Sequence, residues 1–271
     1  MDSKTPWYLG VWRGRAVARA FAAAIVLVSA LSAFAADALF PQPLHIVRRV
    51  EDPVSGTTAT LHEYCAGDQV VTVNGAHVVI ADYAKHQLIE IDRNAGTYSI
   101  TRFDELAKTN DRKASERKEW KTTALGMKSA RSGRSADSFE LSSDKMTLEV
   151  GVDRLTHLSR AAVEVLIGAS YPSARREEHE AILRAAGNAR GGGDRRLVAN
   201  SADAAGDYAL PIEQTLTIEE GGEKLTVHNS VVEVRNELAP DDVRLIPPGA
   251  RLVESRVTRL ARELRDLDHV Q

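Results

Sequence analysis

Short apolar blocks alternate with turn residues between Val70 and Phe103. Asn74-Gly75 separates two Val-rich runs, and such a dipeptide favours a type I′ hairpin, in which both central residues need a positive φ. Residues 83–86 and 93–96 mark the next two turns. Each apolar block is too short for a helix, so the pattern predicts a four-stranded antiparallel meander.

Apolar or β-branched blocks of similar length lie on both sides of this meander, and they predict that the sheet is larger. Alternation changes phase near Ser230–Val232, which indicates a β-bulge. Pro247-Pro248-Gly249 predicts a rigid turn. The further expected strands are 44–50, 57–65, 122–128, 138–141, 146–152, 208–220 and 224–235.

Helical periodicity is concentrated in two regions. Leu158, Ala162, Val165 and Leu166 fall at helical spacing, and Pro172 divides this section from a second helix at 174–186. We therefore expect a helical insertion at about 155–186, followed by a flexible Gly-rich loop at about 187–206 that lacks the Gly-Lys-Ser/Thr ending of a phosphate loop. A stripe of apolar residues predicts a terminal helix over 251–268.

Residues 1–35 have the layout of a secretory signal peptide. Three arginines precede an uncharged apolar run, and Ala33-Phe34-Ala35 offers a small-x-small cleavage site. The run is slightly short of the roughly 20 residues that span a bilayer, which favours cleavage over a membrane anchor. We expect a periplasmic or secreted protein, with anchoring in the inner membrane as the alternative. The mature part, 36–271, is then one domain.

Charge and cysteine content narrow the class of partner. The 271-residue chain has a formal net charge of -3, and loss of four basic residues and one acidic residue with the leader leaves about -6. Nucleic acid is therefore not expected as a partner, because phosphate binding needs a basic face. Cys65 is the only cysteine and lies in a strand-like stretch, so we interpret it as a buried, inert thiol and not as a reactive one.

No pattern of catalytic or metal-ligating residues stands out, so we expect neither an enzyme nor a cofactor. The eight histidines are scattered, and the closest, His77 and His86, lie on different elements. Asp82 and Asp92 suggest paired carboxylates, but both end strands, where Asp normally caps a turn. His179 lies on a charged helix face that we interpret as solvated.

Three stretches together resemble the exported LolA/LolB-like half-barrel proteins, and specifically their uncharacterised relatives. Val79–Ser99 resembles the central hairpins, Tyr208–Ile218 the strand that follows the helices, and Leu245–Ala250 the closing Pro- and Gly-containing segment. The resemblance implies an α+β fold with a strongly curved antiparallel sheet and helices covering its concave face. Well-known members carry lipid or lipoprotein acyl chains there.

Two functions follow as hypotheses. The first is a non-enzymatic exported protein that binds an apolar ligand or an envelope partner, with a cavity between the sheet and the helices. Its expected lining is Tyr83, Tyr98, Ile100, Leu158, Val165 and Leu166. The alternative is an envelope regulatory or interaction protein that acts through the charged 104–121 stretch and the C-terminal helix. That helix carries Arg256, Arg259, Arg262 and Arg265.

Overall fold

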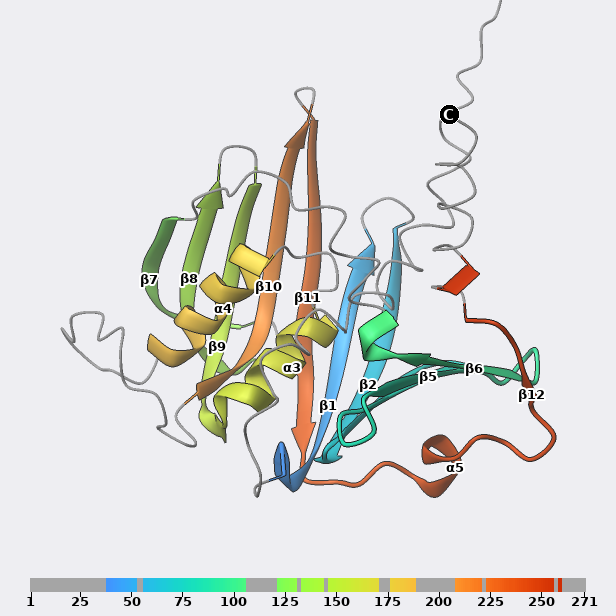
Figure 1. Cartoon of the computed structure of the whole chain (residues 1–271). Coiled ribbons are helices and arrows are strands. Elements are labelled where there is room, and N and C mark those ends of the chain that lie inside the picture. The colour runs from blue at the N-terminus through green and yellow to red at the C-terminus, as the bar shows by residue number, and fades with distance from the viewer. Residues whose placement is uncertain are drawn as a thin grey trace, which may run out of the picture.

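Twelve strands form a single sheet in the computed structural model (Figure 1), which describes residues 38–52, 56–105, 121–130, 133–143, 146–170, 176–188, 208–220, 223–255 and 258–259. The strand order is β12-β6-β5-β4-β3-β2-β1-β11-β10-β9-β8-β7. The strands are β1 (Phe40–Asp52), β2 (Thr57–Gly67), β3 (Gln69–Asn74), β4 (His77–Asp82), β5 (Gln87–Asp92), β6 (Thr97–Arg102), β7 (Lys121–Ser129), β8 (Ser135–Ser143), β9 (Met146–Leu158), β10 (Tyr208–Glu220), β11 (Glu223–Arg235) and β12 (Arg251–Leu252).

The sheet consists of two antiparallel meanders that meet at β1 and β11. Strands β1 to β6 follow one another in space as in sequence, and so do β7 to β11, although helices interrupt the second series. The predicted bulge is confirmed, because Val47 pairs with Glu233 while Arg48 pairs with Val231, which leaves Val232 as the extra residue. Strand β12 pairs in parallel with β6, so the sheet is mixed, and it is open.

The predicted four-stranded meander is confirmed as β3 to β6, but its first turn differs from the expected one. Asn74 pairs with His77, so the two central residues are Gly75 and Ala76. Only Gly75 has a positive φ, at 58°. A type I′ turn centred on Asn74-Gly75 is therefore not formed, and the φ pattern is that of a type II′ turn.

Three helices with both ends among the described residues accompany the sheet: α3 (Arg160–Ser170), α4 (Arg176–Asn188) and the single-turn α5 (Asp241–Arg244); residues 103–105 and 258–259 are also helical. Helix α3 begins five residues later than expected, because 155–158 still belong to β9, whose Leu158 pairs with Tyr208. The Ser159 side chain caps the helix by accepting a hydrogen bond from the Ala162 N–H at 3.1 Å. No described helix is long and apolar enough to span a membrane.

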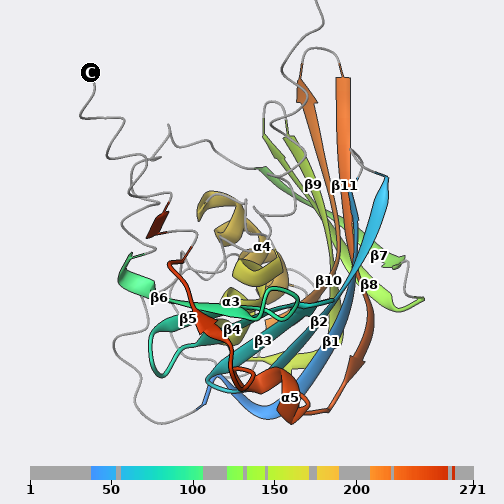
Figure 2. The same ribbon diagram turned by 90° about the vertical axis from the view of Figure 1, so that its right-hand side faces the viewer.

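The helices lie on opposite faces of the sheet. Figure 2 shows α3 and α4 between the β3–β6 part and the β8–β10 part, with α5 beyond β3 on the other side. The predicted Pro247-Pro248-Gly249 turn follows α5 and is closed by a 3.1 Å hydrogen bond from the Ala250 N–H to the Pro247 carbonyl. Gly249 has a φ of 80°, as the third position of a type II turn requires.

Several segments whose structure was predicted from the sequence lie outside the described residues. The leader at 1–35 lies there, as do most of the charged 104–121 stretch and of the Gly-rich 187–206 loop. Of the expected terminal helix, residues 251–252 form β12 instead. Within that helix Arg259 is described as helical, whereas Arg256, Arg262 and Arg265 are not described.

Candidate ligand-binding face of the sheet

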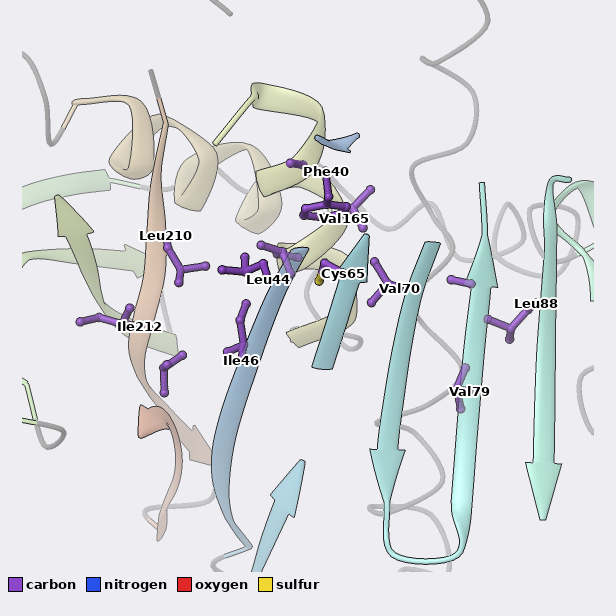
Figure 3. Close-up of a cluster of buried hydrophobic side chains, with 14 of the residues drawn as sticks. Phe40, Leu44, Ile46, Cys65, Val70, Val79, Leu88, Val165, Leu210 and Ile212 are labelled. Atoms are coloured by element: carbon purple, nitrogen blue, oxygen red, sulfur yellow. The ribbon is translucent and has the colours of Figure 1, made fainter. Parts of the chain in front are cut away.

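The sheet face that carries α3 and α4 is lined by apolar side chains from both meanders, and we call it the helix face. Alternate strand residues point to the same side, so Leu44 and Ile46 of β1 join Cys65 of β2 there. Figure 3 shows these side chains beneath α3. The buried cluster is made of Phe40, Leu44, Ile46, Cys65, Val70, Val79, Ala81, Leu88, Phe103, Ala130, Ala136, Ala162, Val165, Leu166, Leu210, Ile212 and Val231.

A buried ion pair interrupts this apolar surface. Arg48 follows Ile46 in the alternation of β1, and Glu63 precedes Cys65 in that of β2, so both side chains point to the helix face. Arg48 Nε donates to Glu63 Oε2 at 2.6 Å, and each side chain is 1% exposed. Removing two charges from water is costly, which makes the pair a conspicuous feature of an otherwise apolar region.

Three hydrogen-bonding groups on the same face have no partner among the described residues; one is the Thr101 hydroxyl, opposite Leu88, and the other two are nitrogen donors. The first nitrogen is Arg48 Nη1, which is buried beside the Nε that contacts Glu63. The second is Nε2 of Gln214, which pairs with the buried Val150 and is itself 5% exposed. Buried polar atoms in native structures nearly always have a partner, so these two positions are candidates for ligand contacts.

The thiol of Cys65 is fully buried next to the ion pair. Burial raises the pKa of this thiol well above its usual range; the Glu63 carboxylate adds to the rise, and the Arg48 guanidinium opposes it. The thiol therefore stays protonated and unreactive at neutral pH. The structure thus confirms that Cys65 is buried, and the raised pKa supports the interpretation of an inert thiol.

Six residues were expected to line a cavity, and the structure places four of them on the helix face and two on the opposite face of the sheet. Val165 and Leu166 of α3 are 3% and 1% exposed and belong to the helix-face cluster, against which Tyr83 and Leu158 also pack. Burial raises the pKa of Tyr83, and its ring contacts that of Phe103 at 5.4 Å between centroids.

Tyr98 and Ile100 instead belong to the opposite face. The Tyr98 side chain packs with Val78 and Ile80 against the segment that contains α5, and Ile100 is 43% exposed. The sequence correctly places the two on one face of β6 by alternation. Because that face is turned away from α3, neither side chain lines the helix face.

A second polar cluster lies on the face opposite to α3. His45 is 3% exposed, and its ring stacks on Tyr64 with 4.1 Å between centroids. His45 Nε2 lies 3.1 Å from Nδ1 of His62, and its Nδ1 lies 3.1 Å from Glu237 Oε2. Burial, with the nearby His45 and Arg235, lowers the pKa of His62. No group of three metal-ligating side chains converges within the described ranges.

Sequence patterns missed both polar groups because each is assembled by pairing between strands. His45 and His62 lie 17 residues apart, and Arg48 and Glu63 lie 15 apart. One signal was present for the second pair: opposite charges occupy apolar-phase positions in two consecutive strands, where a fully buried charge requires a partner.

The two strand-end carboxylates act as turn caps, as predicted. Asp82 Oδ1 accepts a hydrogen bond from the Lys85 N–H, and Asp92 Oδ1 accepts one from the Ala95 N–H, both at 2.9 Å. They end successive strands and so lie at opposite ends of β5, which excludes a catalytic pair. Asp82 Oδ2 is also bound by Gln69 Nε2 at 2.9 Å and by Lys85 Nζ at 3.2 Å.

Asp82→Asn is expected to lower the free energy of unfolding by about 1–2 kcal/mol at neutral pH. Burial alone raises the pKa of the Asp82 carboxyl, but the hydrogen bonds from Lys85 and Gln69 outweigh burial and lower it. A lowered pKa in the folded state gives stability that is present above the unfolded value of about 3.9 and is lost as the pH falls through the folded value.

Urea unfolding between neutral and acid pH measures this difference, which shrinks on acidification. Asp92→Asn is the matched control, since Asp92 caps the equivalent turn with a side chain that is 35% exposed, and it is expected to lose less. A stability difference for Asp82→Asn that is constant with pH would contradict the assignment.

Comparisons with known proteins do not assign the chain to a family. No protein-family model matches the chain, and no curated protein matches it. Two solved structures of PNGF-II, in space groups C2 and P21, match 79% of this chain with a TM-score of 0.36 and sequence identities of 10% and 11%. The chain spans only 31% of the length of those structures. A likeness this weak contributes nothing to the assignment of function.

Proposed function

We propose that this chain is an exported, non-enzymatic protein that binds an apolar ligand, such as a lipid or a lipoprotein acyl chain, against the helix face. The single observation that carries the proposal is the composition of the helix-face cluster. It joins apolar side chains of β1 to β5 with those of β8, β10 and β11 in one continuous buried cluster. Ligand sites for apolar molecules are lined mainly by such side chains with a few polar groups among them.

The contribution of α3 to the helix-face cluster is consistent with a ligand bound between this helix and the sheet. The helix has 11 residues and is about 16 Å long. It contributes Ala162, Val165 and Leu166 to the helix-face cluster, and the strands contribute most of the rest. An acyl chain that lies between α3 and the sheet would use the same apolar side chains.

A half-barrel shape belongs to the same proposal. One cluster contains side chains from β5 and from β8, which are eight places apart in the strand order, and this supports a sheet bent around α3. LolA/LolB-like proteins have that architecture. Export, with removal of 1–35, places the protein in the periplasm or outside the cell. The alternative, regulation through the charged stretch and the Arg-rich terminal helix, concerns residues that are mostly outside the described ranges.

Titration of the purified protein with a fluorescent acyl probe tests the proposal. We expect saturable binding, and Val165→Trp should weaken it about tenfold or more, because the larger indole would compete with an acyl chain for contact with the same apolar side chains. Glu164→Ala, on the adjacent residue of the same helix, should bind as the parent does, since Glu164 is paired with Arg160 and not with the cluster. Absence of saturable binding, or equal binding by Val165→Trp, would refute the proposal.

A further inference from the structure

The unpartnered guanidinium nitrogen on the helix face restricts the kind of apolar ligand that fits there. Arg48 Nε donates to Glu63 Oε2, and Arg48 Nη1 is buried without a partner among the described residues. A donor left unmatched in an apolar environment is unfavourable, and more so when it carries charge. A ligand that brings an acceptor atom to Nη1 removes this cost, whereas a pure hydrocarbon does not.

The position of Arg48 brings this donor next to the apolar cluster. Ile46 precedes it on the same face of β1, and Val231 lies opposite it on β11; both belong to the helix-face cluster. An acyl chain lying along that cluster would therefore place the group at its end beside Nη1. The acceptor then belongs to the head of an amphiphile and not to a separate polar ligand.

The charge of the pair decides which acceptor fits. Glu63 already neutralises Arg48, and both side chains are 1% exposed, so the site is neutral as a whole. A carboxylate at Nη1 would add a second negative charge to a buried region, which is costly without a further cation. An ester carbonyl oxygen accepts the same hydrogen bond and adds no charge.

We propose that Arg48 Nη1 donates a hydrogen bond to the ester carbonyl oxygen of the ligand, so that the helix face selects neutral acyl esters over ionised free fatty acids. This inference rests on the proposed function. The second unpartnered donor, Gln214 Nε2, lies on the same face two strands away, separated by β11. Neighbouring strands are about 4.8 Å apart, so it serves as a contact for a ligand that carries more than one ester group.

Competition against the fluorescent acyl probe tests the selectivity with three matched molecules: methyl tetradecanoate, tetradecanoate and tetradecane. At about pH 8 the free acid is ionised. We expect the ester to displace the probe about tenfold more effectively than the alkane, as one hydrogen bond to a charged donor allows, and the free acid to be weaker than the ester.

The double variant Arg48→Met/Glu63→Leu removes the donor and leaves no unpaired charge, so it keeps the fold. It should bind the alkane as the parent does and lose the preference for the ester. Arg49→Met is the control, because Arg49 is the exposed neighbour on the other face. Equal affinity for ester and alkane in the parent would overturn the inference, and so would tighter binding of the free acid or an ester preference that persists in the double variant. If neither the acyl probe nor any competitor binds, the proposed function itself fails.

Discussion

Arg48→Met alone is expected to lower the free energy of unfolding by about 3–5 kcal/mol, and Glu63→Leu alone by a similar amount. Each single change leaves the other charge buried in an apolar region, because both side chains are 1% exposed and are joined by the 2.6 Å bond between them. The double variant is expected to be about as stable as the parent, since it removes both desolvation costs together.

Denaturant unfolding of the parent, the two single variants and the double variant forms a double-mutant cycle that measures the coupling. The matched control is the pair Arg235 and Glu233, which has the same 2.6 Å separation but is 47% and 44% exposed. Its removal should change stability far less, because water screens an exposed pair. Single variants of Arg48 and Glu63 that are as stable as the parent would show that the pair is hydrated.

Leu166→Ala is the second change with a large expected effect, a loss of about 2–5 kcal/mol in the free energy of unfolding. Leu166 is 1% exposed on α3 and belongs to the helix-face cluster. Shortening it removes apolar contacts with the sheet and leaves a cavity that the surrounding strands fill only in part.

Glu164→Ala on the same helix is the control for this change. It removes the 2.9 Å ion pair with Arg160 one turn away, which is expected to lower the free energy of unfolding by only about 0.5 kcal/mol. The two variants therefore separate packing against the sheet from helix stability in general. Urea unfolding in the absence of added lipid measures both, and a small loss for Leu166→Ala would show that α3 is loosely packed.

Much of the sheet follows from local patterns. The meander β3 to β6, the strand at 208–220 and the bulge at Val232 were all predicted, because alternation and turn residues report on the nearest neighbours along the chain. The start of α3 was less predictable. Leu158 fits both the helical spacing and the end of β9. Its pairing with Tyr208 of the neighbouring strand β10 shows that it belongs to β9.

The candidate site was predicted less well. Val165 and Leu166 were placed correctly against the sheet, because an amphipathic helix must bury its apolar stripe. Arg48 and Glu63 were missed, because a pattern along one strand does not show which residue of a neighbouring strand lies opposite. The same applies to His45 and His62.

By itself, the sequence determined where most of the strands lie, which strands are joined by short turns, and which side chains share a face of each strand. Tyr98 and Ile100 illustrate the limit, since alternation puts them on one side of β6 but does not say which side meets α3. Only the tertiary structure decided that, together with the β1–β11 pairing and the contact between Arg48 and Glu63. The physical reason is that these features depend on register and packing between segments distant along the chain, and short-range periodicity carries no information about them.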